Sequence, residues 1–185
     1  MRRFQDHPIR ITVRRATTLL ELMVVVVILG IVTVSVIPAF ASMNDARKLA
    51  GAQEAERLLL GARASAVAQG RPFGVAIDIG AQTLRTVYIS ASGQTPAPAP
   101  SQDGQGQEVL EIGRRYPGAQ LMSLTDGAGS AVSGSATLWF GYDGTPQRRN
   151  GAGGLIGGWT SDAVLEFAGP SAVTVRRITG AINRS

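Results

Sequence analysis

Chemistry in this chain would have to rest on carboxylates, hydroxyls and arginines. There is no cysteine, and the one histidine is His7, so the main part of the chain lacks a Ser-His-Asp triad, a cysteine nucleophile and most zinc sites. Neither "TDGAGS" nor "YDGTPQ" supplies the oxygens that calcium needs, and "GAGG" lacks the Lys-Ser/Thr of a phosphate loop. The remaining carboxylates are scattered, as is typical of turn caps and solvated side chains: Glu108, Glu111, Asp126, Asp143, Asp162 and Glu166. We predict no enzymatic activity, no cofactor, no metal and no small-molecule substrate.

One carboxylate, Glu21, stands apart from the others. It lies in "RRATTLLELMVVVVILG" (14–30), immediately before 23 uncharged residues, 22–44. About 20 apolar residues span a bilayer as a helix, and an ionisable group within such a helix is costly and is usually functional. A new N-terminal amine, made by cutting the chain just before Glu21, would lie closer to the carboxylate than the upstream arginines do. The pattern therefore predicts a charge pair at the start of a membrane helix.

The basic charge is concentrated at the N-terminus. Residues 1–16 hold five arginines and one aspartate, a net charge of +4, whereas the rest of the chain holds 13 Lys+Arg and 12 Asp+Glu. Positive charge next to an apolar segment is typical of the cytoplasmic side of a membrane protein. The high pI of about 10.7 therefore does not by itself indicate a nucleic-acid partner.

The stretch "ATTLLELMV" (16–24) resembles the class III signal of type IV pilins and type II secretion pseudopilins. In that signal a basic leader and a small residue precede the cut, and a glutamate is fifth in the mature chain. The residue-level alternatives are an ordinary signal anchor, or a secretory signal peptide cut near "AFASM" (39–43). An ordinary anchor would give Glu21 no role.

The resemblance implies specific processing and assembly. A prepilin peptidase would cut between Ala16 and Thr17 and methylate the amine of Thr17, and Glu21 would pair with the amine of a neighbouring subunit. Gly30 and Pro38 fall where helices of this family carry glycine and proline, and proline can kink a helix. The implied partners are other pilins or pseudopilins, the peptidase and an inner-membrane assembly platform. The implied location is a single pass through the inner membrane with the C-terminal domain in the periplasm, from which the protein is extracted into a fibre.

Periodicity predicts the rest of the chain. An apolar stripe over 45–69 indicates a helix, either continuous with the membrane helix or separated from it at Gly51 or Gly61, and the stripe is Leu49, Ala52, Ala55, Leu59, Ala62 and Ala66. Alternation and short apolar runs then predict strands at 72–79, 83–90, 108–112, 119–124, 136–142, 163–168 and 172–178.

These elements predict an α+β, pilin-like fold, with a long transmembrane helix continuing into an amphipathic helix packed on an antiparallel sheet. The chain divides into a leader (1–16), a membrane helix (17–43), an amphipathic helix (44–70) and a β-rich domain (71–185). Within that domain, 91–107 and 125–135 are predicted to be loops, the first too polar and proline-rich to pack.

The β-rich part resembles pseudopilin H and the minor pilin FimT through "GRPFGVAI" (70–77) and "LWFGYDGTP" (138–146). The resemblance favours a minor pseudopilin near the tip of a type II secretion pseudopilus. The alternative is a minor pilin of a type IV pilus that binds DNA, because phosphates attract clustered arginines. The candidate residues for that patch, which could also contact a partner protein, are Arg148, Arg149, Arg176, Arg177 and Arg184. An exported enzyme on an ordinary anchor is disfavoured, since residues 45–185 offer no catalytic base with a partner.

Overall fold

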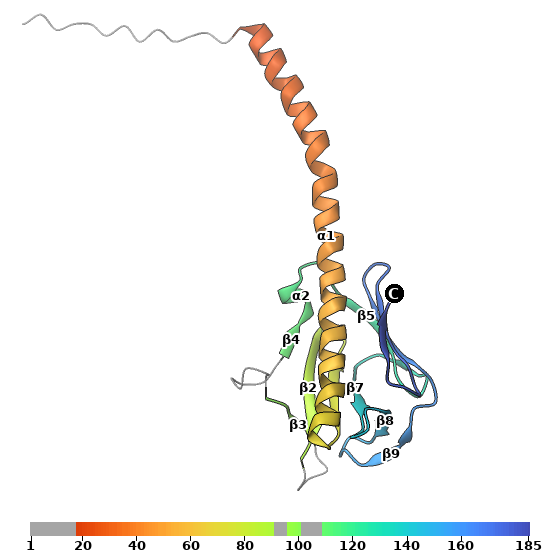
Figure 1. The fold of residues 1–185 in the computed structure, drawn as a ribbon. Coiled ribbons are helices and arrows are strands. Elements are labelled where there is room, and N and C mark those ends of the chain that lie inside the picture. Colours follow the sequence, from red (N-terminus) through yellow and green to blue (C-terminus); the bar gives the residue numbers. More distant parts are fainter. Residues whose placement is uncertain (1–17, 91–95, 101–108) are drawn as a thin grey trace, which may run out of the picture. The chain divides into compact units, whose positions relative to one another are not determined.

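The computed structural model describes residues 18–90, 96–100 and 109–185, except for the side chains of 34–42. The first helix, α1, spans Leu19–Gln69. The chain forms two units, Met1–Ala41 and Ser42–Ser185, and each is described by itself. The second unit holds all the strands (Figure 1).

The strands of the second unit form two antiparallel sheets, where the sequence predicted one. A seven-stranded sheet has the order β3-β2-β1-β7-β8-β9, and β4 also pairs with β2. Its strands are β1 (Phe73–Asp78), β2 (Thr83–Ile89), β3 (Pro96–Pro98), β4 (Val109–Glu111), β7 (Ser135–Phe140), β8 (Pro146–Arg149) and β9 (Leu155–Gly158). A five-stranded sheet has the order β12-β11-β10-β5-β6. Its strands are β5 (Leu121–Thr125), β6 (Ala131–Val132), β10 (Ala163–Phe167), β11 (Ala172–Val175) and β12 (Ile182–Arg184).

One core joins both sheets to α1. The predicted helical stripe is buried from Ala52 onward, with Leu59 fully buried, but Leu49 is 41% exposed because burial of the helix begins at Gly51. The strands contribute their alternate residues to the same cluster, as expected for sheets with one covered face: Phe73, Val75, Ile77, Leu138 and Phe140 from one sheet, and Leu121, Leu124, Leu165, Val173 and Val175 from the other. Figure 1 shows α1 lying across β2 and β7.

The two glycines suspected of breaking the helix, Gly51 and Gly61, both lie inside α1. A Cβ on Gly51 would come within 2.8 Å of the Cβ of Ala119. Gly51 therefore allows the backbone of α1 to approach the turn that follows the short helix α2 (Ile112–Arg115). The sequence predicted a strand through Ile112, but the chain turns into α2 at that residue.

A glutamine ties the two sheets together. Gln82 ends the predicted turn between β1 and β2 and has a positive φ of 55°. Its side-chain amide donates to the carbonyl of Leu121 at 2.9 Å, and its amide oxygen accepts the N–H of Leu121 at 2.7 Å. This pair of bonds satisfies the backbone at the start of β5 and joins the five-stranded sheet to the β1–β2 turn.

Several strand predictions need correction. The segment 91–107 was predicted not to pack, but β3 lies within it and pairs with β2, and Ala99 is only 3% exposed. Proline is tolerated here because β3 is an edge strand and its missing N–H groups cost no ladder bond. The predicted loop 125–135 contains β6. The hairpin of β8 and β9 and the final strand β12 were not predicted.

The strand predicted over 172–178 ends at Val175 because the carboxylate of Asp162 binds the next two residues. The carboxylate accepts the backbone N–H of Arg177 at 2.7 Å and the guanidinium of Arg176 at 2.8 Å. These bonds, the backbone one foremost, lower the pKa of Asp162 below its ordinary value.

This carboxylate should make stability depend on pH. Because the folded pKa lies below the unfolded value of about 3.9, the contribution is present above that value and is lost as pH falls through the folded pKa. We expect Asp162→Asn to lower the melting temperature at pH 6 and to lose that effect progressively as the pH falls below about 3.9. Thermal unfolding of the parent chain and the variant between pH 6 and pH 3 checks this prediction. The control is Asp45→Asn, which removes a carboxylate from an exposed ion pair with Lys48. A difference that stays constant with pH would contradict the assignment.

Candidate assembly helix and basic surface

The helix α1 begins with a capped turn that carries Glu21. The backbone N–H of Glu21 donates to the side-chain oxygen of Thr18 at 3.3 Å, an N-cap contact. The side chain of Glu21 is exposed, and among the described residues its carboxylate has no hydrogen-bond or ion-pair partner. A carboxylate in the first turn is favoured by the helix dipole, and it is free to accept a cation from outside the chain.

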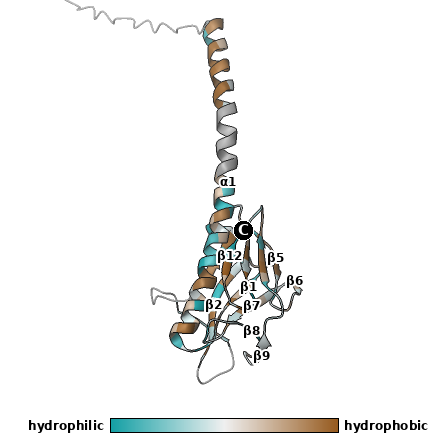
Figure 2. Cartoon of the chain, turned by 45° about the vertical axis from the view of Figure 1, so that its right-hand side comes forward, coloured by the Kyte–Doolittle hydropathy of each residue, from teal (hydrophilic) through white to brown (hydrophobic). Residues whose placement is uncertain are grey.

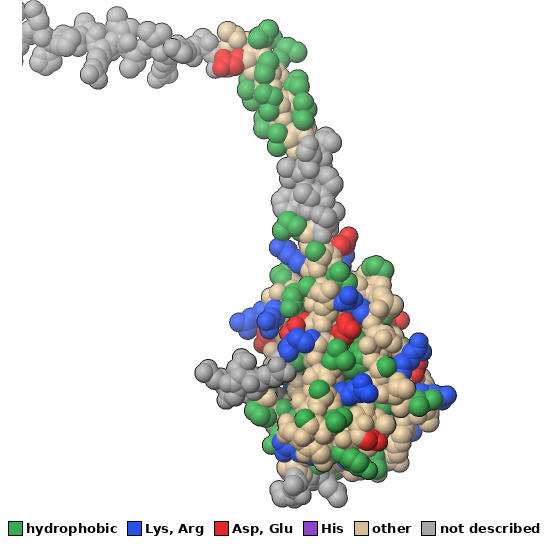
Figure 3. Space-filling view, viewed as in Figure 1, with side chains coloured by type: hydrophobic (Ala, Val, Ile, Leu, Met, Phe, Trp, Pro, Cys, Tyr) green, Lys and Arg blue, Asp and Glu red, His purple; other side chains and the backbone are tan. Residues whose placement is uncertain are grey.

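The described turns of α1 that follow this carboxylate are hydrophobic (Figure 2), and apolar side chains cover the face of them that Figure 3 shows. Every large apolar side chain from Leu19 to Val32 is exposed, with exposed fractions between 47% at Val25 and 76% at Leu19. Among the described residues, no helix combines the length and the hydropathy needed to cross a membrane. These exposed apolar turns form a surface that another apolar group can cover.

Three of the predicted site positions lie outside the described residues: the cleavage pair Ala16 and Thr17, and the side chain of Pro38. Gly30 is described, and a Cβ there would meet no other atom within 4 Å. The kink at Gly30 and Pro38, the cleavage and the methylation stay predictions.

The predicted arginine patch is divided among three places. Arg148 and Arg149 lie in β8, Arg176 and Arg177 lie in the turn after β11, and Arg184 lies in β12. On the face seen in Figure 3, the basic side chains are scattered among neutral ones.

Four of these five arginines have partners. The guanidinium Nη1 of Arg184 lies 3.7 Å from the carboxylate Oε2 of Glu56 in α1, and the guanidinium of Arg177 donates to the carbonyl of Thr160 at 2.9 Å. Arg176 is paired with Asp162, as described above. Arg149 donates to the carbonyl of Gly153 at 2.6 Å and to Gln147 at 3.0 Å, and burial lowers its pKa from the ordinary value. Arg148 has no partner among the described residues. DNA binding by this set stays a prediction.

Arg63, which lies outside the predicted apolar stripe of the helix, links α1 to the sheets. Its guanidinium donates to the carbonyl of Gly144 at 3.1 Å and to that of Thr179 at 2.9 Å. It thereby holds the β7–β8 turn and the turn before β12 against α1. The two carbonyl partners lie more than 80 residues away in sequence, so no local pattern could reveal them.

Within the described part of the chain, no three His, Cys, Asp or Glu side chains gather in a group that could hold a metal ion. The exposed apolar helix with its free carboxylate is therefore the feature of the described chain with the clearest capacity to bind a partner.

No protein-family model and no curated protein sequence matches this chain. Solved structures do match, and two of them are of the minor pseudopilin EpsH from the type II secretion system of Vibrio cholerae. One is 15% identical, covers 77% of this chain and 97% of its own, and superposes with a TM-score of 0.50. The other is also 15% identical, covers 75% of this chain and 96% of its own, and has a TM-score of 0.47. The chain thus shares the fold of these minor pseudopilin structures, a helix with antiparallel sheets, and the sequence predicted this class of fold but with a single sheet.

Proposed function

We propose that this protein is a minor pseudopilin of a type II secretion system, a structural subunit near the tip of the pseudopilus, and not an enzyme. The observation that carries the proposal is the free carboxylate of Glu21 at the start of an apolar helix exposed on all sides. The fold similarity to EpsH supports it. A helix of this kind is suited to leave lipid for the apolar centre of a fibre, because both surroundings accept the same side chains.

The proposal includes processing and location. Prepilin peptidase cuts between Ala16 and Thr17 and methylates Thr17, and the helix over 17–43 holds the chain in the inner membrane with its sheets in the periplasm. The five arginines and Asp6 of residues 1–16 support this topology, since a net +4 favours the cytoplasmic side. The partners are other pseudopilins, the peptidase and the assembly platform.

The second candidate is a FimT-like minor pilin of a type IV pilus. One observation favours it: Arg148 lacks a partner among the described residues, so its guanidinium is available to a phosphate. Against it, Arg149, Arg176, Arg177 and Arg184 are hydrogen-bonded or ion-paired within the protein.

A clean deletion strain separates the two candidates. We expect the strain to lose protein from the medium, because the pseudopilus no longer functions, and to retain natural transformation. Complementation with the full chain should restore secretion. Lost transformation or lost pili with normal secretion would overturn the proposal and move the chain to a type IV pilus.

A further inference from the structure

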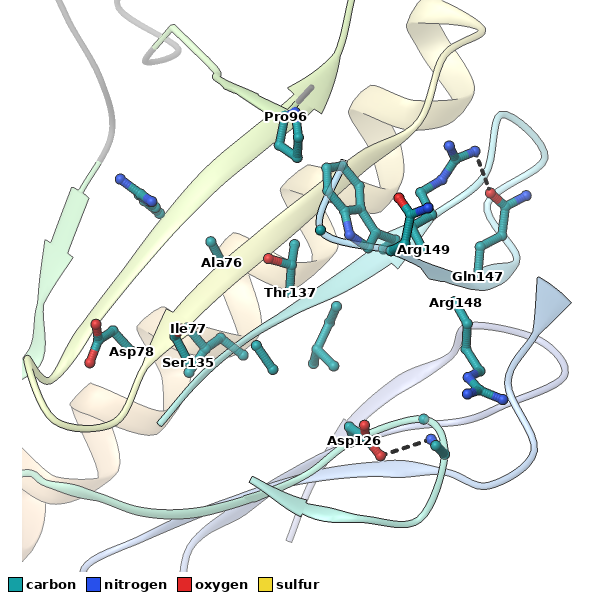
Figure 4. A pocket seen from close by; sticks show the side chains of 18 of the residues that line it. Ala76, Ile77, Asp78, Pro96, Asp126, Ser135, Thr137, Gln147, Arg148 and Arg149 are labelled. Atoms are coloured by element: carbon teal, nitrogen blue, oxygen red, sulfur yellow. Dashed lines mark hydrogen bonds between the residues drawn. The ribbon is translucent and has the colours of Figure 1, made fainter. Parts of the chain in front are cut away.

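A groove of about 640 Å³ crosses the face of the seven-stranded sheet that points away from the core. Its floor comes from alternate residues of the central strands, Ala76 and Asp78 in β1 and Thr137 in β7, whose neighbours Val75, Ile77 and Leu138 are buried under α1. The end of β8, which carries Arg148 and Arg149, and the turn at Asp126 also line the groove. In Figure 4 the side chain of Arg148 extends to the side where the turn at Asp126 lies.

The groove holds two cationic groups without partners. Among the described residues, the guanidinium of neither Arg85 on β2 nor Arg148 on β8 makes a hydrogen bond or an ion pair, although both residues line the groove. A third arginine, Arg149, is occupied within its own hairpin, and its buried Nε has no partner. Guanidinium groups prefer carboxylate or phosphate oxygens, which they can bind through two N–H groups at once.

The carboxylates of the groove do not satisfy these arginines. Asp78 accepts the backbone N–H of Ala81 at 2.8 Å. Asp126 accepts the N–H groups of Ala128 and Ser130, both at 2.9 Å. Both carboxylates are therefore used by their own turns, and the groove as a whole carries more positive than negative side chains.

Apolar side chains border the same groove. Ile156 of β9 is 59% exposed and Val109 of β4 is 43% exposed, and both line it together with Pro96. A ligand that fits this surface carries both carboxylates and aliphatic side chains, which an extended peptide presents on alternate residues.

Aromatic stacking, which single-stranded nucleic acid needs, is restricted here. Trp139 is only 3% exposed, so its ring faces cannot receive a base. The indole of Trp159 packs against Gly127 and donates its N–H to the carbonyl of Gln147 at 3.0 Å. Sequence-tolerant binding of single strands relies on such rings being open, so the groove favours a peptide.

We propose that this groove binds an extended acidic segment of a partner protein, with Arg85 and Arg148 receiving its carboxylates. The inference goes beyond the proposed function and does not depend on it, because it concerns the sheet face rather than the assembly helix. Arg85 was not among the five arginines predicted from the sequence to form a basic patch.

Binding to a defined probe tests the proposal. The full chain in nonionic detergent is titrated into a fluorescein-labelled peptide that alternates aspartate and valine, and polarisation is measured at low salt. The comparison ligands are the asparagine–valine peptide and single-stranded oligothymidine. The variant R85Q/R148Q removes both free cations, and R114Q/R115Q removes two exposed charges from α2, outside the groove.

We expect the aspartate peptide to bind, the asparagine peptide to bind at least about tenfold more weakly, and the affinity to fall as salt rises. R85Q/R148Q should weaken binding by about tenfold or more, and R114Q/R115Q should leave it within about twofold. No binding of the aspartate peptide, equal loss in both double variants, or tighter arginine-dependent binding of oligothymidine would each overturn the proposal. Thermal unfolding of both double variants verifies that they are folded.

Discussion

Replacing Glu21 with alanine should reduce incorporation of the chain into a fibre at least about tenfold. In the proposed assembly the carboxylate faces the N-terminal amine of a neighbouring subunit in apolar surroundings. Removing one partner of such a pair leaves the other charge buried and unpaired, a cost of about 3–5 kcal/mol. The measurement is the fraction of the chain recovered in sheared fibres when it is produced together with the other pseudopilins.

Three controls make the result specific to the charge. Glu21→Asp keeps a carboxylate and should retain partial assembly. Glu111→Gln removes a carboxylate from an exposed ion pair with Arg114 and should assemble normally. Mass spectrometry of the N-terminus verifies that each variant is still cut, since an uncut chain offers no amine at that position. Normal assembly of Glu21→Ala would contradict the role of this residue.

Local pattern predicted the central part of the fold because local and tertiary forces agree there. In β1 and β7 every second residue is apolar and faces the core, and the register pairs Val75 with Leu138. The same agreement holds along α1, whose small and aliphatic residues from Ala52 to Ala66 face the sheets. The apolar run after Glu21 likewise predicted a helix where the described residues form one.

The hairpin of β8 and β9 shows where such reasoning fails. The segment "PQRRNGAGGLIGG" has no alternation and many glycines, so local propensity favours a loop. It forms strands because tertiary contacts fix it: Gln147 pairs with Trp139 in β7, and its carbonyl accepts the indole N–H of Trp159. Both contacts anchor the hairpin to its neighbours, the first to β7 and the second to the residue that follows β9.

The arrangement of the basic side chains could not be predicted from the sequence for a related reason. Five arginines lie close together in the C-terminal part of the sequence, which suggested one basic patch. In the structure Arg184 is paired with Glu56 in α1, and Arg176 is paired with Asp162 before β10. Arg85 was overlooked because one arginine in an alternating strand is expected to face solvent. Only the sheet order brings β2 and β8 to either side of β1 and β7, and so places Arg85 and Arg148 along one groove.

The second large effect is expected at Gly127, in the turn between β5 and β6. A Cβ built on this residue would overlap the indole ring of Trp159, which is rigid and cannot yield as a flexible chain end would. The carbonyl of Gly127 also accepts the N–H groups of Thr160 and Ser161, at 2.8 and 3.1 Å, so the turn cannot move away without losing them. Gly127→Ala should therefore lower the free energy of unfolding by about 1–3 kcal/mol, measured by urea denaturation of the full chain in detergent.

A double-mutant cycle identifies the indole as the cause. In a Trp159→Ala background the overlap is gone, so adding Gly127→Ala should cost less than about 0.5 kcal/mol. Gly134→Ala is the matched control, because a Cβ there meets no atom within 4 Å and the change should be nearly neutral. If Gly127→Ala cost as much without the indole as with it, the effect would lie in the backbone of the turn. The close packing of this turn against Trp159 would then contribute little to stability.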